Sequence, residues 1–206
     1  MHVTAKFAKL VAGVALVGLS SGCGEFTREG RSPVIMVIDA IEVENGGTLL
    51  SDVLQFVTNP APCSVQTPCP VVFNDMADVR LHLILKDPGP PGVIASPSDL
   101  NSVTVNRYRV EYRRTDGRST QGVDVPYAFD SAATFTVPAE GTGGTGFEIV
   151  RHSAKEEAPL MALASNGDII ATIATITFYG RDQAGNDISA SANVGINFGN
   201  FADDGD

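Results

Sequence analysis

The chain has 206 residues and a formal net charge of −10, from 14 Lys and Arg against 24 Asp and Glu. Apolar residues make up 43% of it and charged residues 18%, which is enough to bury a core and excludes wholesale disorder. The acidic balance argues against nucleic-acid binding, because a protein that docks on phosphates needs a basic face. The length fits one large domain or two small ones.

Residues 1–22 have the pattern of an export signal. Lys6 and Lys9 make the start basic, residues 10–19 form an uninterrupted run of apolar or Gly residues, and small residues lead to Cys23. At about 1.5 Å per residue this run is too short to cross a hydrocarbon core of about 30 Å. The sequence therefore predicts a cleaved signal and not a transmembrane helix.

The small residues that end in Cys23 resemble the lipobox of bacterial lipoproteins. In that family the cysteine sulfur receives a diacylglyceryl group, the signal is cut before it, and the new amine is usually acylated. The resemblance implies that Cys23 is lipidated and that the acyl chains anchor the protein to a membrane. An Asp after the cysteine tends to retain such proteins in the inner membrane, and Gly24 stands there instead. The resemblance thus implies an outer membrane lipoprotein that faces the periplasm or the exterior. The alternative is an ordinary cleaved signal with a free Cys23.

Lipidation of Cys23 would leave two cysteines, Cys63 and Cys69, which flank Ser-Val-Gln-Thr-Pro. An oxidising compartment would let them pair as a disulfide across a small loop. A metal or redox pair is the rival interpretation, but the C-x5-C spacing is not that of a zinc site and no His lies nearby.

The rest of the chain reads as strands separated by turn residues, without a convincing long helix. Val79–Lys86 alternates apolar and polar positions, and Tyr108, Val110 and Tyr112 share one face of another segment. The predicted strands are 34–43, 48–57, 79–86, 103–114, 134–137, 147–151, 169–181 and 188–198.

Several connecting segments are also predicted. Residues 45–47 and 183–186 have turn chemistry, 59–70 is a Pro/Cys loop, and 141–146 is a flexible Gly-rich loop. In 169–181 the apolar positions change parity between Ile173 and Ile176, which suggests a bulge or a strand buried on both faces. Residues 153–166 begin like a capping box, but Pro159 interrupts it, so we expect a broken turn or a strand that starts near Pro159.

This pattern predicts an all-β protein, an immunoglobulin-like antiparallel β-sandwich of eight or nine strands. Residues 176–187, with the alternating strand that follows, are similar to the last hairpin of bacterial immunoglobulin-like and fibronectin-type-III-like domains. The Cys–Trp–Cys hallmark of antibody domains is missing, because the chain has no Trp. The expected organisation is a signal (1–22), the lipidated Cys and tether (23–33), one sandwich domain (34–200) and an acidic tail (201–206).

A cluster of arginines is the main candidate for a binding surface on this acidic protein. Because strand residues two apart share a face, several of these side chains would project together and could receive a phosphate or carboxylate. Lipid A, peptidoglycan or an acidic envelope protein would fit such a surface. The alternative is a solvated face whose arginines pair with acids on adjacent strands. The residues are Arg107, Arg109, Arg113, Arg114 and Arg118.

Other candidate sites are weaker. Asp182, Asn186 and Asp187 could supply oxygen ligands to Ca²⁺, although Asx residues are expected in turns anyway. Residues 141–146 match G-x-G-x-x-G but lack the strand–helix context of a nucleotide site. His82 and His152 lie in no recognisable nucleophile motif.

The sequence thus favours a lipid-anchored, non-enzymatic binding or scaffolding protein of the cell envelope, with no cofactor and no nucleic-acid partner. An envelope hydrolase with an unidentified site and a calcium-stabilised adhesion module are the alternatives. The oligomeric state cannot be read from the sequence.

Overall fold

The computed structural model describes residues 30–44, 46–87, 89–90, 92 and 97–201. The predicted signal, Cys23 and almost all of the acidic tail lie outside these ranges. No helix in the described part of the chain is long and apolar enough to span a bilayer. The strands are β1 (Val34–Val43), β2 (Thr48–Asp52), β3 (Gln55–Val57), β4 (Cys69–Val71), β5 (Asp75–Leu85), β6 (Val103–Arg114), β7 (Phe129–Val137), β8 (Thr142–Val150), β9 (Ile170–Asp182) and β10 (Asp187–Gly199). The helical turns are η1 (Asp99–Asn101), α2 (His152–Lys155) and η2 (Leu160–Ser165).

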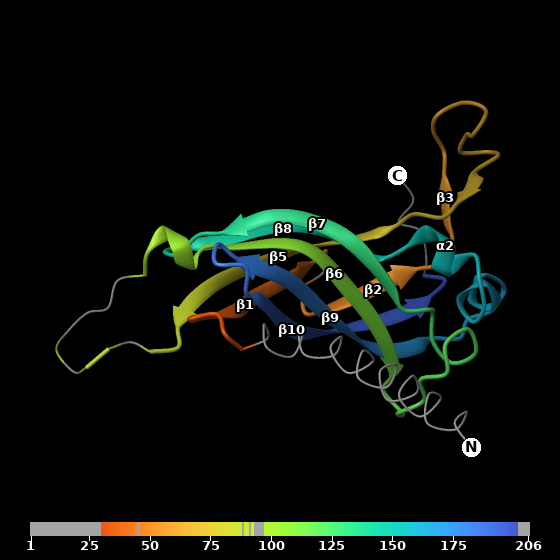
Figure 1. Cartoon of the computed structure of the whole chain (residues 1–206). Helices are drawn as coiled ribbons and strands as arrows, with labels where there is room; N and C mark the ends of the chain where they lie inside the picture. Colours follow the sequence, from red (N-terminus) through yellow and green to blue (C-terminus); the bar gives the residue numbers. More distant parts are fainter. Residues whose placement is uncertain (1–29, 45, 88, 91, 93–96, 202–206) are drawn as a thin grey trace, which may run out of the picture.

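Two sheets pack face to face as a sandwich, which confirms the predicted all-β class (Figure 1). One sheet has the order β1-β5-β8 and the other the order β2-β10-β9-β6-β7. The order of the strands matches that of an immunoglobulin-type domain. The first sheet contains the equivalents of strands A, B and E, which are β1, β5 and β8. The second sheet contains the equivalents of C, F and G, which are β6, β9 and β10. Two details differ from the prediction: the described ranges hold ten strands, and β2 pairs with β10 in parallel.

Aromatic rings fill the middle of the sandwich. Tyr108 on β6 and Phe178 on β9 meet Phe147 from the opposite sheet, with ring centroids 5.1 Å and 5.2 Å from that of Phe147. The Tyr108 hydroxyl donates to the carbonyl of Glu148 at 2.9 Å, and the Tyr112 hydroxyl donates to that of Ile149 at 2.6 Å. Both bonds run from β6 to β8, so the two tyrosines tie the sheets together. Burial raises the pKa of Tyr112, which keeps its hydroxyl protonated as a donor.

The expected alternation in β6 and β10 is confirmed. Tyr108, Val110 and Tyr112 are buried, while Arg109 and Glu111 between them face outward. In β10, Val194, Ile196 and Phe198 are likewise buried. The period of two therefore placed these strands correctly.

The predicted strand 48–57 is interrupted. β2 ends at Asp52, whose carboxylate accepts from the backbone N–H of Leu54, and β3 begins at Gln55 in a separate two-stranded sheet with β4. The turn before it, where Gly46 and Gly47 adopt positive φ, carries the chain from one sheet of the sandwich to the other. The apolar character of residues 48–57 is continuous, so it does not show that β2 pairs with β10 while β3 pairs with β4.

The predicted Gly-rich loop 141–146 is wrong, since Thr142–Gly146 form the first half of β8 and pair with β5. A Cβ on Gly144 would lie 2.1 Å from the Val79 carbonyl oxygen, and one on Gly143 would lie 2.5 Å from that of Thr136. These glycines therefore serve close backbone approach rather than flexibility. Two neighbouring strands also begin earlier than expected, β5 at Asp75 and β7 at Phe129.

The parity change predicted in β9 has a different cause from a bulge in that strand. Thr172 occupies an inward, buried position, and its hydroxyl donates to the Ile196 carbonyl at 3.0 Å. β9 and β10 pair without a shift of register. The irregularity lies instead in β6, between Val105 and Arg107. A strand buried on both faces describes β9 better, because all of its outward residues except Arg181 are half-buried.

Residues 153–166 contain two short helical segments. Of the two expectations, this agrees with the broken turn and not with a strand. The helix α2 begins at His152 with Arg151 as its N-cap, so Ser153 makes no capping box. Pro159 separates α2 from η2, and no strand starts there.

Replacement of Gly144 by Ala should destabilise the domain strongly, because the new methyl group would overlap backbone that cannot move without breaking the β5–β8 ladder. We expect a loss of about 2–4 kcal/mol in the free energy of unfolding, measured by urea denaturation. Gly167→Ala is the matched control, since nothing lies within 4 Å of a Cβ there. Equal stability of the two variants would contradict the close approach.

Candidate functional site

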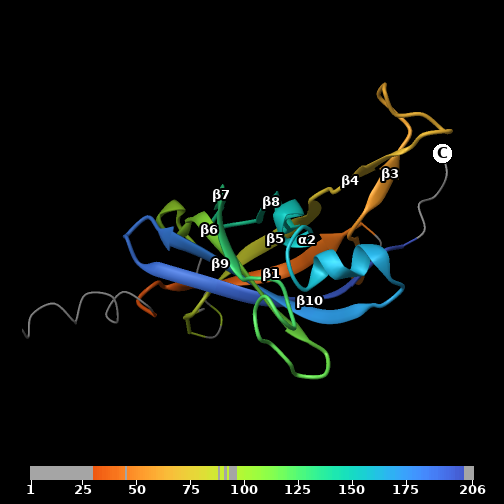
Figure 2. The same cartoon turned by 90° about the vertical axis from the view of Figure 1, so that its right-hand side faces the viewer.

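An arm formed by residues 53–74 projects from one end of the sandwich (Figures 1 and 2). Its stem is the two-stranded sheet β3–β4, in which Gln55 pairs with Val71 and Val57 with Cys69. The Cys63–Cys69 disulfide closes the outer loop, with the two Cα atoms 5.3 Å apart, and confirms the predicted pairing. Loop-closure entropy for so short a ring gives about 2 kcal/mol, so the disulfide fixes the loop rather than the domain.

Hydrogen bonds within the loop fix its conformation further. Ser64 and Thr67 exchange both of their backbone hydrogen bonds at 3.1 Å, and their hydroxyls are 2.8 Å apart. The Cys63 N–H donates to the Pro60 carbonyl at 3.1 Å. The tip of the arm is thus an ordered structure although much of it is exposed.

The arm carries no Asp, Glu, Lys, Arg or His, and it is the longest run of this kind in the chain. Large apolar side chains are exposed along it: Phe56 by 45%, Val65 by 73% and Phe73 by 47%. Charged residues are depleted and aromatic residues enriched at the centres of protein–protein interfaces. The arm therefore has the composition of a contact surface on an otherwise acidic molecule.

A buried lysine holds both ends of the arm. The Lys155 ammonium, on α2, donates to the carbonyl oxygen of Asp52 and to the carboxylate of Asp75, each at 2.8 Å. Asp52 directly precedes the arm and Asp75 directly follows it. The Lys155 side chain is only 1% exposed, and the Ser51 hydroxyl donates to the second carboxylate oxygen of Asp75 at 2.5 Å. We call Lys155, Asp75 and the Asp52 carbonyl the clamp.

Further hydrogen bonds anchor the same region to the sandwich. The Asn74 side-chain oxygen accepts from the His152 N–H at 3.1 Å and lies 3.0 Å from the His152 Nδ1. The Asp52 carboxylate accepts from the N–H of Phe201 at 3.3 Å, and the Val53 N–H donates to the Gly199 carbonyl at 2.9 Å. The direction in which the arm leaves the domain is therefore defined by side chains and not only by the chain path.

Burial raises the pKa of Asp75 above its ordinary value, although the Lys155 charge and the hydrogen bonds from Lys155 and Ser51 act in the opposite direction. Removal of the ammonium would leave a buried carboxylate without its cation. Such a change is strongly destabilising, because the remaining charge is largely shielded from water, with its side chain 15% exposed, and keeps the Ser51 hydrogen bond but no cation.

Sequence reasoning missed the clamp. Lys155 lies in the segment with the least regular pattern, and a buried lysine has no signature in a single sequence, since most lysines are exposed. One signal was present but unused: the charge-free run 53–74 is bounded on each side by an Asp. That boundary marks where the arm meets the domain.

The structure places four of the five predicted arginines in two groups. Acidic side chains lie beside the arginines of each group. Arg107 and Arg109 bind the two carboxylate oxygens of Asp130 at 2.9 Å and 2.5 Å, and Arg109 also contacts Glu111 at 3.2 Å. Hydrogen bonds from Glu111 and Asp130 raise the pKa of Arg109. The Arg107 guanidinium lies over the Tyr179 ring, 4.1 Å from its centroid.

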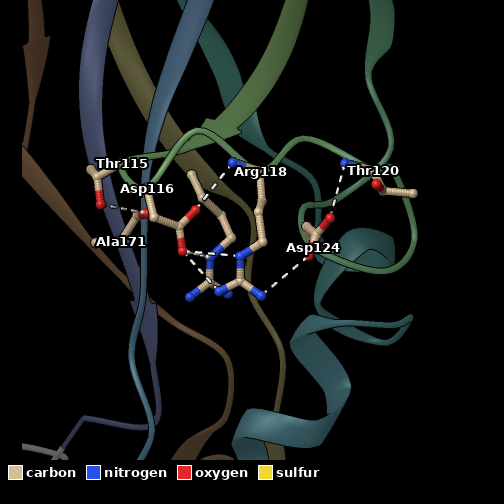
Figure 3. A network of polar contacts seen from close by, with 7 residues as sticks. Thr115, Asp116, Arg118, Thr120, Asp124 and Ala171 are labelled. Carbon is tan, nitrogen blue, oxygen red and sulfur yellow. Dashed lines mark hydrogen bonds and ion pairs between the residues drawn. The ribbon is translucent and has the colours of Figure 1, made fainter.

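The turn after β6 holds the second group (Figure 3). Arg118 lies between Asp116, at 2.8 Å, and Asp124, at 3.5 Å, and Arg114 reaches Asp116 at 3.3 Å. Hydrogen bonds from Arg118 lower the pKa of Asp116 to about 2. Arg113 points outward from β6 and is exposed. Four of the five arginines thus face acids of their own surface, which favours the alternative of a self-paired face.

The calcium candidates are engaged in the β9–β10 turn. Asp182 accepts from the N–H of Ala184 at 3.0 Å and from the N–H and side-chain amide of Asn186 at 2.8 Å each. Burial alone would raise the pKa of Asp182, but the bonds from Asn186, Ser32 and Ala184 outweigh it and lower the pKa. Asp187 pairs with Arg181 at 2.6 Å. Within the described ranges, no three His, Cys, Asp or Glu side chains are grouped to hold a metal.

His82 and His152 are far apart and have separate partners. His82 lies on β5 with its Nδ1 2.5 Å from the Asp39 carboxylate, and His152 starts α2 beside Asn74. Asn74 and His82 are eight residues apart along an extended segment, roughly 25 Å. A hollow of about 280 Å³ near Gly30 and Lys86, and one of about 320 Å³ between Arg107 and Asp130, contain neither histidine.

Comparison with family models finds no match for this chain, and comparison with curated proteins finds no relative.

Replacement of Lys155 by Met should lower the free energy of unfolding by about 3–5 kcal/mol at pH 7, because it leaves Asp75 buried and unpaired. Because its folded-state pKa is raised, Asp75 contributes most to stability below its unfolded pKa, and this contribution is lost as pH rises through the folded pKa. Without the lysine that pKa rises further, so the deficit of the variant should shrink towards about pH 4. Urea unfolding of the wild type and the variant at pH 7 and at about pH 4 measures this difference in the free energy of unfolding.

Lys86→Met is the control for this experiment, since Lys86 is exposed and its ammonium donates to the Gly30 carbonyl at 3.0 Å. The double variant Lys155→Met/Asp75→Asn should recover part of the lost stability. A deficit that is the same at both pH values, with no recovery in the double variant, would argue against an ion pair.

Calcium should leave the melting temperature unchanged, because the Asp182 oxygens already accept hydrogen bonds from the turn. Differential scanning calorimetry with Ca²⁺ and with a chelator measures this, since an ion bound only to the folded state raises the melting temperature. A rise in Ca²⁺ that Asp182→Ala abolishes would instead support the adhesion-module alternative.

Proposed function

We propose that this protein is a lipid-anchored component of the cell envelope, with a non-enzymatic binding or scaffolding role. The observation that supports a binding role is the arm, which is uncharged, partly apolar and held by the clamp and a disulfide. A surface that is already ordered loses little conformational entropy on association, so more of its contact energy appears as affinity.

The position of the arm suits an anchored protein. Gly30, the first described residue, lies beside the β9–β10 turn, where it lines a hollow with Asp187. The arm leaves from the other end of β10, where Val53 bonds to Gly199. With 13 residues at about 3.3 Å each, β10 separates these two ends by roughly 40 Å. A membrane anchor at Cys23 would thus hold the domain by the end opposite the arm.

Within this proposal the arm, rather than the arginine face, is the contact surface. Most of the arginine charge is already balanced by Asp130, Asp116 and Asp124, so an anionic partner such as lipid A or peptidoglycan would have to displace existing ion pairs. No observation favours the hydrolase alternative.

Cys23→Ala should move the protein from the membrane fraction to the soluble fraction, because the acyl chains are the proposed anchor. Fractionation of cells that express the wild type and the variant measures this, with release of the wild type by detergent but not by high salt. The double variant Cys63→Ser/Cys69→Ser is the control and should remain in the membrane. A Cys23→Ala protein that stays in the membrane fraction would contradict lipid anchoring at this residue.

A further inference from the structure

The composition of the arm restricts the kind of surface it can meet. Its residues carry no charge, so it offers no ion pair to a charged partner, and contact with a charged surface would desolvate that surface without an opposite charge to compensate. The surface that fits it best is equally uncharged and partly apolar. Among the described residues, the arm is itself such a surface.

The charge of the whole molecule limits where two copies could touch. Two copies with a net charge of −10 each repel one another, and a contact between their bodies would bring like charges together. The arm projects from the body (Figure 1), so two arms can touch while the acidic sandwiches stay apart. Contact of the same patch on both copies is also the arrangement that closes a two-fold dimer.

We propose that the arm is a self-association surface, through which two copies of this chain form a dimer by arm-to-arm contact. Val65 at the outer loop, with Phe56 and Phe73 nearer the stem, supplies the apolar contact area. The clamp and the disulfide orient and stiffen the two arms before they meet. This inference names the partner in the binding role proposed above and rests on that role, but it does not depend on the lipid anchor.

Val65→Asp tests the contact, and Val123→Asp is its matched control. Both side chains are highly exposed, at 73% and 68%, and both substitutions add one negative charge, but Val123 lies outside the arm. Sedimentation velocity of the mature chain with Cys23→Ala, up to about 200 µM, should show a monomer–dimer equilibrium. Val65→Asp should weaken that equilibrium by about tenfold or more, and Val123→Asp should leave it unchanged. A chain that stays monomeric, or equal effects of both substitutions, would overturn the proposal.

Cross-linking in cells separates this inference from the proposed function. A photoreactive phenylalanine analogue at position 65, in cells that express two differently tagged copies, should give a covalent dimer that carries both tags. The analogue at position 123 should not. Cross-links from position 65 only to other proteins would overturn self-association but leave a binding role standing. The absence of any cross-link from position 65 would count against both.

Discussion

The ion pair between Lys155 and Asp75 is the interaction on which the organisation of this molecule depends. The lysine is almost completely buried, and it joins the short helix α2 to the two residues that flank the arm. Two buried charges gain stability from one another only with good geometry and further hydrogen bonds, and Ser51 and the Asp52 carbonyl supply these. Without this contact the arm would still be joined to the sandwich by the buried Val53 and by the hydrogen bonds of Asn74 and Asp52. The clamp thus fixes the direction in which residues 53–74, inserted between β2 and β5, project from the sandwich.

The sandwich and the arm use different physical means to achieve order. The sandwich depends on burial, with aromatic rings at its centre and two tyrosine hydroxyls that bond across the sheets. The arm has two strands of three residues each, too few for independent stability, and it relies on the disulfide, the Ser64–Thr67 bonds and the clamp. The backbone that carries its exposed apolar side chains is therefore held in place without a core beneath it, which suits a contact surface.

Residue patterns predicted the sandwich because its strands alternate clearly. β1 and β6 have the predicted boundaries, and β10 was placed to within a residue at either end. The errors occurred where long-range contacts decide the outcome. The glycines of β8 look like a loop until Val79 and Thr136 are known to approach them, and 48–57 looks continuous until its hydrogen-bond partner changes. The clamp could not be predicted, because Lys155 and Asp75 are eighty residues apart and neither lies in a motif.

Hydrogen exchange in the Lys155→Met variant tests the account most directly, because it reports on the arm separately from the sandwich. If the clamp orients the arm, exchange should accelerate first at the amides around its base, those of Leu54, His152 and Phe201, while the amides of β9 and β10 stay protected. The disulfide-closed tip should change less than the base. If exchange at the base were unchanged, or if the whole domain accelerated equally, Lys155 would contribute only to global stability and the clamp would not control the arm.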